Sequence, residues 1–128
     1  MTKLYIGCSL IFASKEFINF VSELKLELKP YFEILEFVGL NGKTSQEVYA
    51  HDRKCVLESD LFLAICDYPS TGLGMEIGFA IENQKKLIIG SKKNIKISKM
   101  LLGIPAEKVE FLEYENIEEL VEFLKKLI

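Results

Sequence analysis

The chain has 128 residues, a formal net charge of −3 and 49% hydrophobic residues. This length provides one domain with a buried core and is short for two, so we expect a single domain over residues 1–128. No apolar run is long enough to cross a bilayer, and a net negative charge disfavours nonspecific binding to nucleic acid. We therefore expect neither a membrane nor a nucleic acid as a partner.

The first residues lead directly into a strand-like segment, without the basic, apolar and small-residue succession of a signal peptide. We expect a cytoplasmic protein on that basis. The three cysteines, Cys8, Cys55 and Cys66, form no Cys-x-x-Cys pair, and His51 is the only histidine. This pattern predicts reduced, buried thiols, no bound metal and no cofactor.

Strand-like and helix-like segments alternate from one end of the chain to the other. We predict strands at residues 4–8, 31–37, 60–66, 86–90 and 109–112. The first predicted helix ends before Pro30, and its apolar stripe consists of Phe17, Val21, Leu24 and Leu28.

A loop containing Gly39, Asn41 and Gly42 precedes the second predicted helix. Thr44, with Glu47 three residues later, forms the capping-box pattern that starts this helix. The third predicted helix covers residues 72–84, and a short apolar turn follows at 97–102. Asn116 is the predicted cap of the last helix, with Glu119 three residues on and an apolar stripe of Ile117, Leu120, Val121, Leu124 and Ile128.

Strands alternating with helices are typical of a parallel α/β sheet. Five strands with crossover helices predict a flavodoxin-like (Rossmann-like), doubly wound, five-stranded parallel sheet. In such sheets the ligand binds beyond the carboxyl ends of the strands, near the point where the strand order reverses. The loops that follow Cys8 and Cys66 should therefore meet at the site.

Two acidic residues fall on helix faces that are otherwise apolar. Glu76 lies within the stripe of Leu73, Ile77, Ala80 and Ile81, and Asp52 lies on the face of Val48, Cys55 and Val56. Desolvation makes an ionised carboxylate in such a position unfavourable unless it is paired or hydrogen-bonded. Such a residue therefore indicates either a structural partner or a catalytic function. For Glu76 the structural alternative is a bond to backbone donors or a lysine. For Asp52 it is an exposed acid at a helix end.

Two carboxylates aimed at the mouth of one sheet suit cleavage of a glycosidic bond, in which one acts as nucleophile and the other as proton donor. Tyr5 stands in the first predicted strand, from which its hydroxyl could reach a carboxylate at the pocket floor. Its structural alternative is a core aromatic with a satisfied hydroxyl.

The turn before the third helix contains Ser70, Thr71, Gly72 and Gly74, and its free amides could bind an anion or sugar hydroxyls. The glycine spacing does not match the dinucleotide-binding motif, and the segment has no P-loop lysine. A separate basic region holds six lysines between Lys85 and Lys99. It is either a solvated surface or a rim that attracts phosphate.

Tyr5, Asp52 and the segment from Pro69 to Ala80, with its Gly72-x-Gly74-x-Glu76-x-Gly78 spacing, resemble the nucleoside 2-deoxyribosyltransferase superfamily. The resemblance spans nearly the whole chain. Within the superfamily the sequence is more similar to the 2'-deoxynucleoside 5'-phosphate N-hydrolases, which carry a serine at the position of Ser70.

The resemblance implies catalytic roles: Glu76 as the nucleophile at the anomeric carbon, Asp52 as the proton donor to the base, and Tyr5 as the residue that holds Glu76. It also implies a homodimer, with Ser9, Ser70, Gly72 and the partner's Ser98 binding the 5'-phosphate. The hydrolases carry an arginine where this chain has Ile11. Lys92, Lys93 and Lys99 are the candidates to replace that charge.

The sequence thus predicts an enzyme that hydrolyses the N-glycosidic bond of 2'-deoxynucleoside 5'-monophosphates through a glycosyl-enzyme intermediate. One alternative is a deoxyribosyltransferase, which shares the first half-reaction but admits a second base in place of water. Another is a noncatalytic module that binds a nucleotide.

Overall fold

The structure is a computed structural model that describes residues 1–39 and 43–128. Its five strands form one sheet in the order β2-β1-β3-β4-β5, and every neighbouring pair is parallel. This is the flavodoxin-like order, so the predicted fold class is confirmed. The strands are β1 (Lys3–Cys8), β2 (Glu33–Leu35), β3 (Leu61–Ile65), β4 (Lys86–Lys92) and β5 (Glu110–Tyr114). Asn41 and Gly42 of the predicted loop lie outside the described residues.

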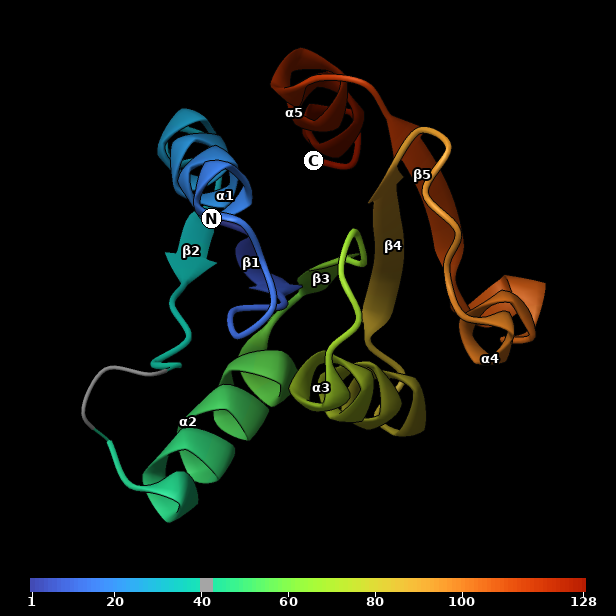
Figure 1. The fold of residues 1–128 in the computed structure, drawn as a ribbon. Coiled ribbons are helices and arrows are strands. Elements are labelled where there is room, and N and C mark those ends of the chain that lie inside the picture. Colours follow the sequence, from blue (N-terminus) through green and yellow to red (C-terminus); the bar gives the residue numbers. More distant parts are fainter. Residues whose placement is uncertain (40–42) are drawn as a thin grey trace.

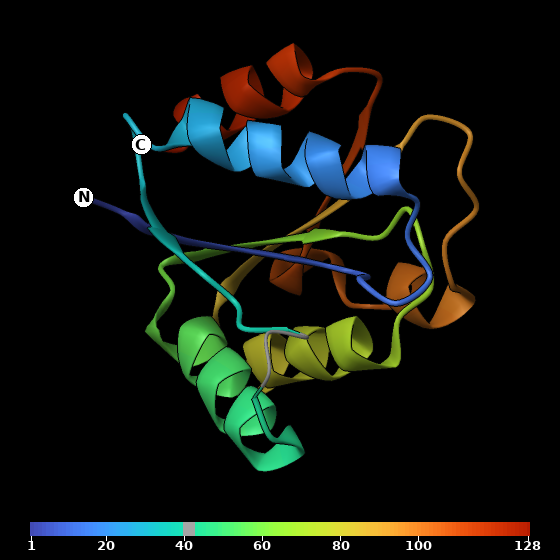
Figure 2. The same ribbon diagram turned by 60° about the vertical axis from the view of Figure 1, so that its left-hand side comes forward.

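Helices cover both faces of the sheet, as Figures 1 and 2 show. One face is covered by α1 (Lys15–Leu28) and α5 (Ile117–Lys125), and the other by α2 (Ser45–Glu58) and α3 (Thr71–Glu82). The short helices α4 (Lys99–Leu102) and η1 (Ala106–Lys108) lie between β4 and β5 in the chain.

Successive side chains of β1 enter opposite layers of the core, because strand side chains alternate between faces. Leu4 and Ile6 join the core beneath α1 and α5, whereas Tyr5 joins the core beneath α2 and α3. The apolar stripe of α1 is buried as predicted. β1 therefore presents Tyr5 to the layer that also contains the two acid-bearing helices.

The predicted helix caps are confirmed. Thr44 Oγ1 accepts the backbone N–H of Glu47 at 3.2 Å, and the Glu47 carboxylate accepts the N–H of Thr44 at 3.4 Å. Asn116 Oδ1 accepts the N–H of Glu119 at 3.1 Å. α1 begins after Ser14, whose Oγ accepts the Phe17 N–H at 3.1 Å.

Several predicted boundaries are wrong by a few residues. β2 begins at Glu33 rather than at residue 31 because the amides of Tyr31 and Phe32 donate to the last turn of α1 at Leu28, and it ends at Leu35 rather than at residue 37. β4 and β5 extend further than predicted, to Lys92 and Tyr114, which are paired in the register. α3 ends at Glu82 rather than at residue 84, since Gln84 has a φ of +54° that is incompatible with a continuing helix.

Within the described residues, no helix combines the length and apolar character needed to cross a membrane.

Candidate active site

A cavity of about 580 Å³ is lined by β1 and the loop after it, by α2 and by the start of α3. Six of the seven predicted site residues line it: Tyr5, Ser9, Asp52, Ser70, Gly72 and Glu76. The loops after Cys8 and Cys66 meet there, as expected. Ser98 does not line the cavity; it is exposed and caps α4, where its Oγ accepts the Met100 N–H at 3.1 Å.

Glu76 reaches the cavity because α3 packs Leu73, Ile77 and Ala80 against the sheet, which turns the neighbouring carboxylate toward β1. Glu76 Oε2 accepts a hydrogen bond from the hydroxyl of Tyr5. The tyrosine is fully buried, and its ring lies 5.3 Å from that of Phe62. The partner of Glu76 is thus a tyrosine on another element, rather than a backbone donor or a lysine.

The surroundings of Glu76 place its titration near neutral pH. Burial raises the pKa of this carboxyl to about 7, the Tyr5 hydrogen bond opposes that rise, and the charge of Asp52 adds to it. Burial and the charge of Glu76 together raise the pKa of Tyr5 far above its usual range. Tyr5 therefore remains a hydrogen-bond donor while Glu76 changes its protonation state.

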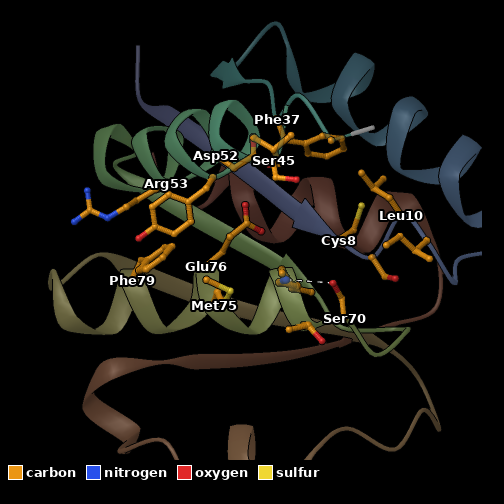
Figure 3. A pocket seen from close by; sticks show the side chains of 18 of the residues that line it. Cys8, Leu10, Phe37, Ser45, Asp52, Arg53, Ser70, Met75, Glu76 and Phe79 are labelled. Carbon is orange, nitrogen blue, oxygen red and sulfur yellow. Dashed lines mark hydrogen bonds between the residues drawn. The ribbon is translucent and has the colours of Figure 1, made fainter. Parts of the chain in front are cut away.

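Asp52 is half-buried on α2, so the alternative of an exposed acid at a helix end is wrong. Its Oδ1 accepts the backbone N–H of Val38 at 3.1 Å, which ties α2 to the segment that follows β2. Figure 3 shows Asp52 and Glu76 entering the same cavity from two helices. The site therefore holds two carboxylates, and one of them is oriented by a tyrosine.

Gly7 belongs to the site although the sequence did not single it out. A Cβ at this position would lie 3.0 Å from Glu76 Oε1, 3.0 Å from Leu73 Cδ1 and 3.0 Å from Phe62 Cε1. The missing side chain therefore provides the space that the carboxylate occupies. The available signal was its position on β1, two residues after Tyr5 and on the same face.

One end of the cavity combines hydroxyl groups and the N-terminus of α3 with the side chains of Cys8 and Leu10. Ser70 caps this helix by accepting the Leu73 N–H at 3.2 Å. Ser9 also lines the cavity and is almost fully buried. Ile11 lines the same cavity with 72% of its surface exposed. None of the candidate lysines Lys92, Lys93 and Lys99 lines the cavity, and Lys93 pairs with Glu115 at 3.0 Å.

The other end of the cavity contains three side chains that the sequence analysis did not identify, namely Tyr49, Arg53 and Phe79. The Arg53 guanidinium lies 5.5 Å from the centre of the Phe79 ring, and the Phe79 and Tyr49 rings meet edge to face at 5.9 Å. The signal for Arg53 was its place beside Asp52 and its being the chain's only arginine.

The three cysteines are free thiols. Cys55 is buried as predicted, whereas Cys8 and Cys66 are half-buried, so the prediction of buried thiols is wrong for these two. Cys55 Sγ lies 3.4 Å from His51 Nε2, but burial raises the pKa of this thiol to about 11. It stays protonated near neutral pH and is a poor nucleophile. In the part of the chain that the structure describes, no group of three or more His, Cys, Asp or Glu side chains is placed to hold a metal ion.

The chain is similar in sequence to a protein of Thermofilum pendens named "Putative 2'-deoxynucleoside 5'-phosphate N-hydrolase 1". The two are 29% identical over 89 residues, which is 68% of this chain and 62% of that protein. The chain therefore spans less than two thirds of this curated relative. No protein-family model matches the chain.

Two solved structures share the fold. The CMP N-glycosidase BcmB of Clostridium botulinum superposes with a TM-score of 0.77 at 21% identity, covering 99% of this chain and 100% of that one. A 2-desoxiribosyltransferase from Leishmania mexicana superposes with a TM-score of 0.72 at 12% identity, covering 98% of each chain.

Proposed function

We propose that the chain is a member of the nucleoside 2-deoxyribosyltransferase superfamily, to whose 2'-deoxynucleoside 5'-phosphate N-hydrolases its sequence is similar, and that it hydrolyses the N-glycosidic bond of 2'-deoxynucleoside 5'-monophosphates. The observation that carries the proposal is the Tyr5, Glu76 and Asp52 arrangement in one cavity. A module that only bound a nucleotide would have no need of two half-buried carboxylates, whose desolvation is unfavourable.

In the first step, Glu76 attacks the anomeric carbon of the deoxyribose. In the reactive form of the site, Glu76 is ionised and Asp52 carries a proton. The bond between the anomeric carbon and the base nitrogen breaks, its electron pair stays with the base, and Asp52 supplies its proton to the base. Tyr5 holds Oε2 of Glu76, which fixes the orientation of the carboxylate for attack. The product is a glycosyl ester on Glu76 and a free base.

In the second step, water attacks the same carbon and displaces the Glu76 carboxylate. Asp52, now ionised, accepts the proton that the water loses, so both carboxyl groups return to their starting states. The released product is 2-deoxyribose 5-phosphate. In a transferase, a second base would take the place of this water.

The 5'-phosphate is assigned to the end of the cavity that holds Ser9, Ser70 and Gly72. Hydroxyl groups and the first amides of α3 can donate hydrogen bonds to an anion there, and the helix dipole favours negative charge. An ideal Cβ at Gly72 meets no atom within 4 Å, so the space above this glycine is open to a ligand.

The proposal is tested by incubating the protein with deoxynucleoside 5'-monophosphates and the corresponding deoxynucleosides, with and without a free acceptor base. We expect base release from the monophosphates alone. Exchange of one base for another would support the transferase instead. Binding of a nucleotide without any release of base would support the noncatalytic module instead.

Replacing Tyr5 with phenylalanine is expected to move the pH dependence of base release to higher pH. Glu76 must be ionised to attack, so kcat/KM should rise with pH through about 7 in the wild-type protein. The Tyr5 hydrogen bond favours the ionised form, and its loss raises the pKa of Glu76 further. The measurement is the pH profile of kcat/KM for both proteins; an unchanged acid limb would show that the hydroxyl does not set this pKa.

We also propose a homodimer in which Ser98 of each chain reaches the partner's cavity, because Ser98 is exposed and does not line the cavity of its own chain. Ser98→Ala should then weaken cleavage of monophosphates. Mixing inactive Glu76→Gln with Ser98→Ala should restore activity, since a mixed dimer has one site with an intact Glu76 and the partner subunit's Ser98. Strictly additive activities in the mixture would argue against a shared site.

A further inference from the structure

The cavity wall beyond Asp52 is built from an arginine and two aromatic rings. Arg53 lies on α2 next to Asp52, its guanidinium stands over the Phe79 ring at 5.5 Å, and Phe79 contacts Tyr49 edge to face. The contact with the ring limits the orientations of the guanidinium. All three residues line the cavity.

The N–H donors of the Arg53 guanidinium are not used in an ion pair with any described residue. Among the described residues, two cationic side chains line the cavity, Lys43 and Arg53, and Lys43 is paired with Glu47 at 3.9 Å. Arg53 forms no ion pair with any carboxylate of residues 1–39 and 43–128. Its planar group carries five N–H donors in a fixed fork, which suits two adjacent acceptor atoms of one planar partner.

The layout of the cavity indicates which part of a substrate Arg53 meets. In Figure 3, Glu76 occupies the middle, with Ser70 and Leu10 on one side and Phe79 and Arg53 on the other. Arg53 is exposed, and its side chain extends outward at the rim of the cavity, beyond Phe79 as seen from Glu76. If the sugar lies over Glu76 and the phosphate lies at the Ser70 end, the base extends toward Arg53. Aromatic walls are suitable there because bases stack on them.

We propose that Arg53 selects the base, by donating two hydrogen bonds to bases that present two adjacent acceptors. Guanine offers O6 and N7, the pair that arginine recognises most often in DNA. Cytosine offers O2 and N3. Adenine and thymine have a donor beside each of the corresponding acceptors and cannot accept both bonds. The inference rests on the proposed function and names the substrate class of the same site.

The charge of Arg53 serves the same selection. When the bond to the sugar breaks, the electron pair moves onto the base, and negative charge grows on its ring and carbonyl acceptors. The interaction between a cation and these atoms is strongest in the transition state. Removing the cation should therefore lower kcat as well as raise KM.

The test is to measure kcat/KM for dGMP, dCMP, dAMP and dTMP with the wild-type protein, Arg53→Met, Arg53→Lys and the control Lys54→Met. Lys54 is the neighbouring cation; it pairs with Glu58 at 3.8 Å and does not line the cavity. We expect Arg53→Met to lose roughly 5- to 150-fold for dGMP and dCMP and only about twofold for dAMP and dTMP.

Arg53→Lys keeps the charge but not the fork, so most of the selectivity should be lost with it. Lys54→Met should leave all four values unchanged. A thermal melt of each variant confirms that it is folded. Equal losses for all four bases, or no loss, would overturn the role of Arg53 while leaving the proposed function intact. Absence of base release by the wild-type protein would instead overturn the proposed function.

Discussion

Replacing Glu76 with glutamine is expected to lower base release by roughly 10⁴-fold or more, because the amide cannot form the glycosyl ester. Glutamine keeps the shape of the side chain, and its carbonyl can still accept the Tyr5 hydroxyl, so the cavity should be preserved. The measurement is single-turnover base release from a deoxynucleoside monophosphate. A variant with substantial activity would show that Glu76 is not the nucleophile.

The same substitution is expected to stabilise the fold. The pKa of Glu76 is about 7 in the folded protein and 4.5 in a model peptide, so the folded state binds this proton more tightly. The resulting contribution to stability is present below pH 4.5 and is lost as the pH rises through about 7. Above neutral pH, Glu76→Gln should therefore raise the free energy of unfolding by roughly 1–3 kcal/mol relative to the wild type.

The matched control is Glu82→Gln, which makes the same chemical change on an exposed position of the same helix. It should alter neither base release nor the pH dependence of stability. Urea unfolding of the three proteins at pH 4 and pH 8 gives the comparison. Equal stability of Glu76→Gln and the wild type at both pH values would contradict the buried, destabilising carboxylate.

Replacing Asp52 with asparagine is expected to lower kcat/KM by roughly 10²- to 10⁴-fold, the usual contribution of a general acid. The Val38 N–H now bonds to Oδ1 of the carboxylate, and the amide oxygen of asparagine can accept the same bond. The loss should therefore reflect proton transfer rather than a rearranged α2.

A dependence on the leaving group separates these two explanations. A base that leaves readily needs little protonation, so the loss caused by Asp52→Asn should shrink as the base analogue becomes more acidic. The control Glu58→Gln changes an exposed acid of α2 and should leave kcat/KM unchanged for every leaving group. A loss that is the same for every leaving group would assign Asp52 a role in positioning alone.

Local patterns were sufficient to predict the fold. Parallel order follows from alternating strands and helices, and the caps at Thr44 and Asn116 are set by neighbours three residues away. The ends of the strands were harder to predict, because they depend on the hydrogen-bond partners that the backbone finds in other elements. β2 begins two residues later than predicted because the last turn of α1 uses the amides of Tyr31 and Phe32, and no feature of residues 31–37 encodes that competition.

Glu76 and Asp52 were predicted as site residues from their apolar surroundings on each helix. The site residues that depend on contacts between different elements were not predicted. Glu76 of α3 occupies the space beside Gly7, and the role proposed for Arg53 depends in part on Phe79 of another helix, whose ring lies 5.5 Å from its guanidinium. Such contacts depend on how α2 and α3 pack on β1. A single sequence shows the residues but not their separation.

The most direct test of the proposed mechanism is to trap the ester on Glu76. A deoxynucleotide analogue with fluorine at C2' slows the second step, because the electron-withdrawing atom destabilises the positive charge that develops on the sugar. Peptide mass spectrometry should then find the fluorinated sugar phosphate on the peptide that contains Glu76, and not on Glu76→Gln. Release of base from the analogue without any such adduct, or an adduct on another residue, would contradict the mechanism.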